Sequence, residues 1–338
     1  MGTWIWGGGG AAGGQGAAGW LAGALVVALV VDALWGEPPA SLHPVVWMGR
    51  ALGALGAHLA PPGERAQDWK TFWLAALAWC GLAAIVWIAA WALQALVLCF
   101  LPGWAAALVL GLALKPLLAW RMLRSEVAAV EQQLAQSLHA GRERLSWLVS
   151  RDTARLDAAQ VRESAIETLA ENLCDSVVAP LLWFALLGLP GAALYRLANT
   201  ADAMWGYPGW RGEGAARRHW QWAGKWAARA DDVLSWLPAR LTALLLLLGG
   251  GVRGFGAVSP LGLWRDARAT PSPNGGWPMG AMARLLGVRL GKPGVYVLHP
   301  QGQAPQAAHV ARALRYGQNV VFILAVAGLA AMIFSFLS

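Results

Sequence analysis

Two long uncharged runs dominate the pattern of hydrophobic and polar positions along the chain. Residues 72–101 form a run of 30 residues, and residues 318–338 form another of 21. About 20 consecutive apolar residues are enough for a helix to cross the hydrocarbon core of a bilayer. Both runs therefore predict membrane-spanning helices.

Four shorter apolar runs leave more than one interpretation open. Residues 104–120 and 17–31 each have one ionisable group at or near one end and predict two further spans. Residues 177–195 contain two prolines, and residues 236–252 contain an arginine and only a short leucine run. Each of these last two segments could be a span, a re-entrant helix or a buried half-helix.

The fold class follows from what a bilayer permits. Backbone polar groups cannot face lipid unpaired, and the apolar runs are too long for the alternating strands of a barrel. The composition agrees, because 57% of the residues are hydrophobic and 13% are charged, whereas about a quarter are charged in a typical soluble domain. We predict an all-α, polytopic integral membrane protein with about 4–6 membrane-embedded helices and a carboxylate-rich site at its cytoplasmic face.

The domain organisation is predicted to be simple. Residues 1–19 are rich in Gly and Ala and lack the basic start of a cleavable signal, so we expect a flexible tail. Residues 20–338 form one membrane-embedded domain, with a cytoplasmic polar segment at 121–176. The three cysteines, at positions 80, 99 and 174, have neither metal nor redox spacing.

The charge distribution predicts orientation and partners. Lys and Arg total 26 against 18 Asp and Glu, which gives a net charge of +8, and the basic residues lie beside or between the apolar runs. This pattern favours positive-inside topology and contact with the lipid bilayer, and no nucleic-acid partner is expected. Because no Lys or Arg precedes Arg50, the loop 36–71 should face the cytoplasm. We expect a multi-pass protein of the cell (inner) membrane.

An acidic stripe is the most informative polar feature. Asp157 and Gln160 fit a capping box that starts a helix. Four carboxylates then recur every fourth residue on one face of that helix: Glu163, Glu167, Glu171 and Asp175. A solvated acidic face is the simpler explanation, but this helix leads directly into the apolar run 177–195. An ionisable group at membrane depth costs about 3 kcal/mol and usually persists for a function.

Further carboxylates flank two of the apolar runs. Asn199 and Asp202 follow the run 177–195, and Asp231 and Asp232 precede residues 236–252. Carboxylate and amide oxygens suit Mg²⁺ and, through it, phosphate, although helix capping or pairing with arginine could also explain each acid. A shared site would require both ends of 177–195 to lie on one face of the membrane, which favours the re-entrant interpretation.

Other polar groups are less specific. The basic residues that could hold phosphate oxygens are not distinguished by spacing: Arg50, Arg151, Arg196, Lys225, Arg240 and Arg289. His43 lies in a proline-rich loop, where a structural role is the more usual one, and Ser272 and Asn274 lie in a glycine-containing loop. No Walker-type loop or nucleophile elbow is visible in the sequence.

Many of these short motifs, in this order, resemble the CobD/CbiB family of cobalamin biosynthesis, the membrane-bound adenosylcobinamide-phosphate synthases. The resemblance extends from about residue 25 to the C-terminus. It rests on these positions: Asp32, Glu37-Pro38, His43-Pro44-Val45, Gly49-Arg50, Arg151-Asp152-Thr153, Glu167, Glu171-Asn172, Asp175, Asn199-Thr200, Asp202, Asp231-Asp232, Trp236, Arg240, Ser272-Pro-Asn274 and Gly287-Val-Arg-Leu290. An ordered series of this length is far more specific than any single motif.

The resemblance implies an ATP-dependent amide ligase that joins (R)-1-aminopropan-2-ol or its phosphate to the free carboxylate of adenosylcobyric acid. It implies Mg²⁺ as cofactor, ATP as co-substrate and an acyl phosphate intermediate. The expected catalytic residues are Glu167, Glu171, Asp175, Asp202, Asp231 and Asp232, of which Glu171, Asp175, Asp202 and Asp232 would hold the metal. The expected substrate-binding residues are His43, Arg50, Asn172, Asn199, Arg240, Ser272 and Asn274. The sequence does not decide whether the protein forms homo-oligomers or contacts other proteins of the corrinoid pathway.

The chain departs from the family pattern at a few positions. Leu173 and Cys174 replace small hydroxyl residues, and Met279 stands where an acidic residue often follows the proline. Two other functions remain open. A regulatory membrane protein like AmpE would lack much of the acidic set, and an intramembrane prenyl-type transferase would need a second Asp where Gly206 stands.

Overall fold

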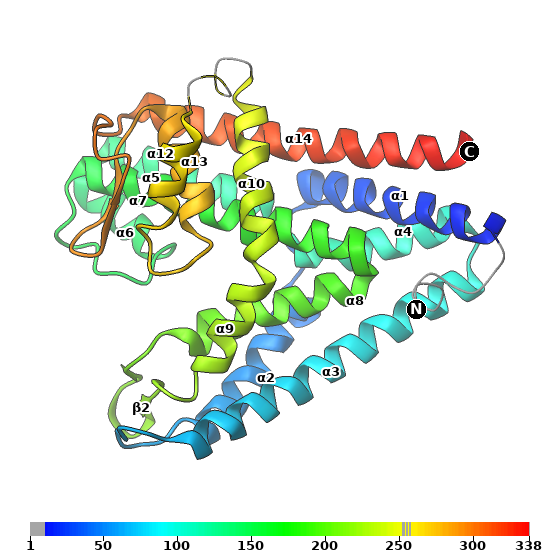
Figure 1. Cartoon of the computed structure of the whole chain (residues 1–338), viewed down its shortest axis with the longest axis horizontal. Coiled ribbons are helices and arrows are strands. Elements are labelled where there is room, and N and C mark those ends of the chain that lie inside the picture. Colours follow the sequence, from blue (N-terminus) through cyan, green and yellow to red (C-terminus); the bar gives the residue numbers. More distant parts are fainter. Residues whose placement is uncertain (1–10, 252–253, 255, 257, 338) are drawn as a thin grey trace.

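The computed structural model describes residues 11–251, 254, 256 and 258–337, and helices make up nearly all of its regular structure (Figure 1). The helices have these bounds: α1 Ala11–Trp35, α2 Pro44–Leu59, α3 Trp69–Phe100, α4 Gly103–Leu114, α5 Trp120–Gln136, α6 Leu138–Ser146, α7 Ala158–Leu173, α8 Ala179–Ala201, α9 Lys225–Leu234, α10 Trp236–Gly249, α12 Pro260–Ala267, α13 Gly276–Leu286 and α14 Ala307–Leu337.

Short elements complete the described fold. Three 3₁₀ turns cover Ala40–Leu42, Lys115–Leu117 and Gly214–Ala216, and two π-helical turns cover Cys174–Val178 and Asp202–Gly206. Two small antiparallel ribbons pair β1 (Trp210–Arg211) with β2 (Arg218–His219), and β3 (Leu290–Lys292) with β4 (Tyr296–Leu298). The all-α prediction is therefore confirmed.

The long apolar helices match three of the four predicted spans, whereas the run 17–31 corresponds to the shorter apolar helical segment Gly19–Trp35. Four described stretches are long and apolar enough to cross a bilayer: Trp69–Phe100, Gly103–Gln136, Ala158–Gly206 and Ala307–Ser335. The pair α9 and α10, bent by 45°, would make a fifth. Figure 1 shows α1, α4 and α14 running together to one end of the molecule, with α5, α6, α7, α12 and α13 gathered at the other end.

The N-terminal helix differs in extent from the predicted tail. Residues 1–10 lie outside the described residues, and α1 already begins at Ala11, so residues 11–19 are helical. Four of these nine residues are alanine, which is the strongest helix former and here offsets the cost of the glycines.

The apolar run 177–195 is a hairpin of two half-helices. Gly188, inside α8, has φ 70° and ψ −160°, a combination that is accessible essentially only to glycine. Pro190 follows two residues later and cannot donate a backbone hydrogen bond. The chain turns back here (Figure 1), and the hydroxyl of Tyr195 in the second arm donates to Oδ1 of Asp175, just before the first arm, at 3.3 Å. The two ends of the run thus lie side by side, as the re-entrant interpretation predicts.

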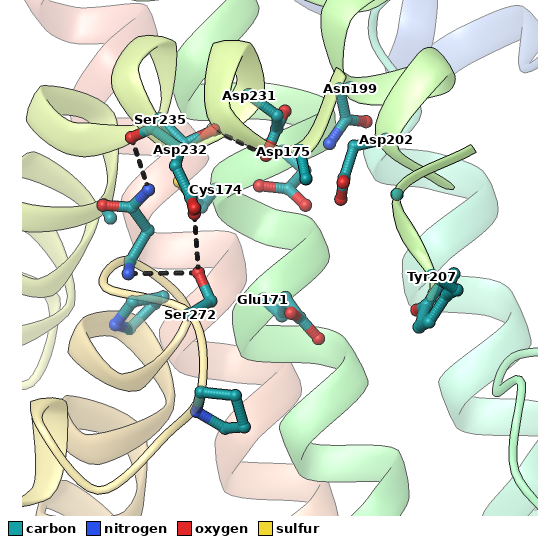
Figure 2. Close-up of a pocket in the computed structure, with 17 residues that line it drawn as sticks. Glu171, Cys174, Asp175, Asn199, Asp202, Tyr207, Asp231, Asp232, Ser235 and Ser272 are labelled. Atoms are coloured by element: carbon teal, nitrogen blue, oxygen red, sulfur yellow. Dashed lines mark hydrogen bonds between the residues drawn. The ribbon is translucent and has the colours of Figure 1, made fainter. Parts of the chain in front are cut away.

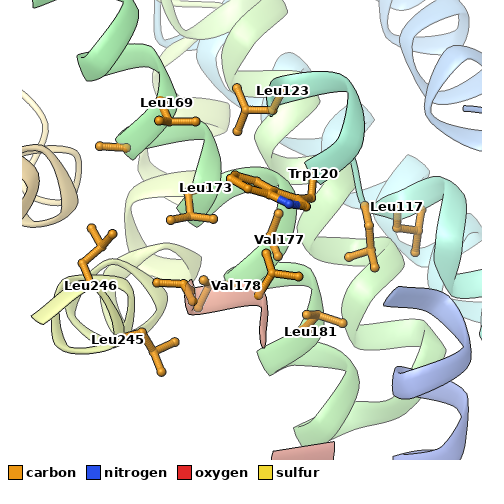
Figure 3. Close-up of a cluster of buried hydrophobic side chains, with 14 of the residues drawn as sticks. Leu117, Trp120, Leu123, Leu169, Leu173, Val177, Val178, Leu181, Leu245 and Leu246 are labelled. Carbon is orange, nitrogen blue, oxygen red and sulfur yellow. The ribbon is translucent and has the colours of Figure 1, made fainter. Parts of the chain in front are cut away.

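A buried apolar cluster fixes the hairpin in the bundle. Leu173, Val177, Val178 and Leu181 are at most 2% exposed, and they lie between Trp120 and the leucines of α10 (Figure 3). Burying each such side chain contributes about 1.5–3 kcal/mol relative to leaving it exposed. The first arm of the hairpin is thereby held against α5 on one side and α10 on the other.

Candidate functional site

The acidic helix α7 starts as predicted. Asp157 accepts a hydrogen bond from the backbone N–H of Gln160 at 2.8 Å, and the Gln160 side chain accepts one from the backbone N–H of Asp157 at 2.8 Å. This capping box orients the stripe of four carboxylates. Their environments differ along the helix, because Glu163 is bound to Arg289 at 3.2 Å and Glu167 to Arg151 at 3.0 Å. Glu171 and Asp175 form no such ion pair with any residue that the structure describes.

Glu171 and Asp175 lie at the end of the stripe and line a cavity of about 360 Å³. Between them, α7 gives way to the π-helical turn Cys174–Val178, a type of irregularity that is frequent at functional sites. Arg196 of the returning arm donates to the backbone oxygen of Asp175 at 3.2 Å. This hydrogen bond holds the start and the end of the hairpin together at the cavity.

Asn199, in the returning arm, and Asp202, directly after it, line the same cavity (Figure 2). Asn199 lines the cavity together with Asp175 and Asp231, and its side-chain oxygen accepts a hydrogen bond from Arg196 at 3.4 Å. The chain then makes the second π-helical turn, in which a side chain at Gly206 would collide with Asp202. Glycine at position 206 therefore allows the Asp202 carboxylate to line the cavity.

Helix α9 supplies the third acidic group, Asp231 and Asp232. Ser235, at the bend between α9 and α10, donates to Oδ2 of Asp231 at 3.4 Å, and its oxygen lies 3.1 Å from the hydroxyl of Tyr195. The side-chain hydroxyls of Tyr195 and Ser235 therefore connect the carboxylate of Asp231 with that of Asp175.

The loop before α13 closes the cavity opposite the hairpin. Ser272 donates to Oδ1 of Asp232 at 3.3 Å, and the carboxamide of Asn274 donates to the backbone oxygen of Asp232 at 2.7 Å. Oδ1 of Asn274 accepts from Arg240 at 3.2 Å, and the Arg240 guanidinium lies over the rings of Trp236 and Trp277. Asn274 thus ties the loop to both α9 and α10.

The structure brings five carboxylates to what we call the acidic cavity: Glu171, Asp175, Asp202, Asp231 and Asp232. Among the described residues, none of the five forms an ion pair with Lys or Arg, and Oδ1 of Asp231 is buried without a hydrogen-bond partner. Several carboxylates in a cleft repel one another unless a cation joins them. The cavity is therefore built to receive positive charge.

A second, adjoining cavity of about 450 Å³ shares Glu171, Asp175, Asn199 and Asp202 with the first. Its far wall includes Asn172 and the ring of Tyr296 from β4. Burial, together with the negative charges of Glu167 and Glu171, raises the pKa of Tyr296 above its usual range. Its hydroxyl therefore stays protonated at neutral pH and remains a hydrogen-bond donor.

Four of the predicted residues line neither cavity: His43, Arg50, Glu167 and Arg240. Glu167 is buried and paired with Arg151, and Arg240 donates to Asn274. His43 is 3.2 Å from Oε2 of Glu37, whose carboxylate also lies 2.9 Å from Nζ of the buried Lys115, and Arg50 is exposed on α2. His43 belongs instead to a buried charged group that joins the end of α1 to α4.

Two residues of the site, Tyr195 and Ser235, were not found by sequence reasoning, and Arg196 was named only among the basic residues that spacing does not distinguish. The sequence Leu187-Gly-Leu-Pro-Gly191 was the available signal, because two glycines and a proline in five residues predict a turn. Such a turn would have placed Tyr195 and Arg196 back beside Asp175.

The donor set fits Mg²⁺. Within the part of the chain that the structure describes, no three His, Cys, Asp or Glu side chains form a ready-made metal cluster. Mg²⁺ that accompanies a nucleotide takes only one or two carboxylates and keeps water and phosphate oxygens as its other ligands. Pairs drawn from Glu171, Asp175, Asp202 and Asp232 would satisfy that requirement.

Comparison with known proteins gives a consistent result. The family model described as "CobD/Cbib protein" matches residues 25–317. A "Cobalamin biosynthesis protein CobD" from Chromobacterium violaceum is 41% identical over 321 residues, covering 91% of this chain and 96% of the relative. A "Probable cobalamin biosynthesis protein CobD" from Methanothermobacter thermautotrophicus is 40% identical over 280 residues, covering 81% and 85%. No solved structure matches the chain.

Proposed function

Because this chain belongs to the CobD/CbiB family of cobalamin biosynthesis proteins, we propose that it is an ATP-dependent amide ligase. The reaction joins the amine of (R)-1-aminopropan-2-ol or its phosphate to the free carboxylate of adenosylcobyric acid, giving adenosylcobinamide or its phosphate. Five carboxylates from α7, α9 and the two π-helical turns converge on one cavity, and none forms an ion pair among the described residues; this observation best supports the proposal.

The chemistry requires activation of a poor electrophile. A carboxylate becomes reactive toward an amine once its oxygen carries a phosphoryl group from ATP, because phosphate can then leave when the C–N bond forms. The amine enters as an ammonium ion, and it loses one proton to become a nucleophile and a second as the amide forms. ATP is converted to ADP and phosphate, so the atoms balance.

The chain contributes mainly charge and position. Glu171, Asp175, Asp202 and Asp232 would hold Mg²⁺, which supplies positive charge that offsets the phosphate oxygens. The negative potential of the cavity attracts both that metal and the incoming ammonium group. Asn199, which is held by Arg196 at 3.4 Å, and Ser272 lie beside these carboxylates and would orient the substrates.

Purified protein in nanodiscs, supplied with adenosylcobyric acid, Mg-ATP and aminopropanol phosphate, tests this function through mass-spectrometric detection of the amide. We expect product from the parent protein, and we expect Glu171→Gln to lose at least about 100-fold of the rate, as is typical when a charged group of this kind is removed. Glu143→Gln, at an exposed position on α6, is the matched control and should keep parental activity. Absence of product from a folded parent with verified substrates would refute the proposal.

A further inference from the structure

The cleft formed by the two cavities is electrically polarised. Five carboxylates line the acidic cavity. The adjoining cavity shares three of them, Glu171, Asp175 and Asp202, and is lined in addition by Arg151 and Lys292. Arg151 and Lys292 line the adjoining cavity and not the acidic cavity, whereas Asp231 and Asp232 line only the acidic cavity. A ligand that fits such a cleft carries negative charge at one end.

The two cations come from distant parts of the chain and are fixed differently. Arg151 precedes α7, donates to Ser164 at 3.3 Å and to Glu167 at 3.0 Å, and its side chain is 17% exposed. These contacts set the plane of its guanidinium. Its remaining N–H groups stay available for an oxyanion, and a guanidinium matches phosphate oxygens geometrically.

Lys292 ends β3, and its backbone is paired with Tyr296 of β4. Its side chain is half-buried and borders both the adjoining cavity and a third cavity formed with Gln160 and Glu163. Across residues 11–251 and 258–337, the Lys292 ammonium forms no ion pair. A half-buried ammonium group that lines a cavity and forms no ion pair can accept an anionic ligand there.

Hydrogen-bonding groups surround these cations. Thr168, Asn172 and Tyr296 line the same cavity. The hydroxyl of Thr168 can donate to an anion, and the hydroxyl of Tyr296, which donates to the weak acceptor Sδ of Met279 at 3.8 Å, can do so by exchanging that partner. Two cations with neutral donors form the usual environment of a phosphoryl group, whereas a carboxylate would need fewer donors.

We propose that Arg151 and Lys292 form a phosphoryl-binding subsite at the basic end of the cleft. This proposal rests on the proposed ligase function, which supplies two candidate phosphoryl ligands. They are the phosphates of the nucleotide and the phosphate of the phosphorylated amine. In both cases the phosphoryl group binds at the basic end, and the acidic cavity receives the metal or the ammonium group.

Lys292→Gln is the clean variant, because Lys292 has no ion pair to lose among the described residues and lies at the end of the short strand β3. Lys292→Arg should retain function, and Lys70→Gln, at an exposed position on α3, is the matched control. The first measurement is calorimetric binding of ATP to each protein in EDTA, which does not depend on turnover. The second is the separate KM for ATP and for aminopropanol phosphate, with free aminopropanol as comparison.

We expect Lys292→Gln to raise either the ATP constants (Kd and KM) or the KM for aminopropanol phosphate about tenfold or more, as for the loss of one charged hydrogen bond. Lys70→Gln should raise none of them. A rise in the ATP constants identifies nucleotide phosphates as the ligand. A rise in the KM for aminopropanol phosphate, with loss of its advantage over free aminopropanol, identifies the phosphorylated amine. Product formation with ATP binding and both KM values within twofold of the parent would overturn the subsite. Weakened ATP binding in a protein whose parent makes no amide would retain the subsite and refute the ligase.

Discussion

The side-chain oxygen of Gln94 in α3 accepts a hydrogen bond of 2.7 Å from the backbone N–H of Leu189, at the turn of the α8 hairpin. Gln94 is 3% exposed and lies within a 30-residue run without charge. A backbone break in apolar surroundings leaves N–H groups that lipid cannot satisfy. Gln94 therefore stabilises the turn that brings the two ends of the hairpin to the acidic cavity.

Removing that acceptor should destabilise the protein. Gln94→Leu leaves the Leu189 N–H without a partner, which costs about 1–3 kcal/mol, and we expect a lower thermal midpoint in detergent together with reduced ligation. Gln132→Leu, at an exposed position on α5, makes the same chemical change and should have little effect. Equal midpoints for the two variants would argue against the role of Gln94.

Alanine at position 188 should be poorly tolerated. A side chain there would collide with Gln94, and the backbone conformation at φ 70° and ψ −160° is strained for any residue with a Cβ, so a cost of about 1–3 kcal/mol is expected. Gly81 lies in α3 with open space around its Cβ position, and Gly81→Ala should be neutral or stabilising by roughly 0.5–1 kcal/mol. Calorimetric unfolding tests whether Gly188→Ala lowers the free energy of unfolding while Gly81→Ala leaves it unchanged or raises it.

The start of α3 should respond to acid. Burial alone would raise the pKa of Asp68, but hydrogen bonds from the Thr71 backbone (3.0 Å) and hydroxyl (2.7 Å) and from Arg65 (3.2 Å) outweigh it, and the pKa is lowered overall. Because the folded pKa lies below the unfolded one, the stabilisation is present above the unfolded value. It is lost as pH falls through the folded pKa.

Asp68→Ala should therefore cost about 1 kcal/mol of unfolding free energy at pH 7, as expected for a lost N-cap. The difference from the parent should shrink as the pH is lowered below 4. Glu64→Ala, at an exposed position four residues earlier, should show no such dependence. A cost for Asp68→Ala that stays constant down to the acid limit would contradict the lowered pKa.

The Mg²⁺ concentration that the reaction requires should depend on the carboxylates of the acidic cavity. Chelation of Mg²⁺ should stop amide formation, and Asp202→Asn should raise the Mg²⁺ concentration for half-maximal rate by about tenfold or more, since a carboxylate is a far better Mg²⁺ ligand than an amide. Glu143→Gln again provides the exposed control. An unchanged Mg²⁺ dependence in Asp202→Asn would exclude that residue from the metal site.

The sequence predicts the acidic site only in part, and the reason is physical. The capping box and the spacing of Glu171 and Asp175 are local signals, so the start of the helix and its acidic face can be predicted from the sequence. Tyr195 and Ser235 lie among apolar residues, and their roles depend on the turn at Gly188 and the bend after α9. Lys292 reaches the cleft through a small ribbon that follows α13, and no pattern within the chain could place it there.

The most direct test of the account is the side of the membrane on which the two ends of the hairpin are exposed. In a protein with Cys80, Cys99 and Cys174 replaced by serine, single cysteines at Asn172, Ala203 and Pro102 can be labelled with an impermeant maleimide in oriented vesicles. We predict that Asn172→Cys and Ala203→Cys react from the same side, and that Pro102→Cys, in the turn between α3 and α4, reacts from the other. Labelling of Asn172→Cys and Ala203→Cys from opposite sides would show that residues 177–195 cross the membrane, and it would contradict a shared carboxylate site.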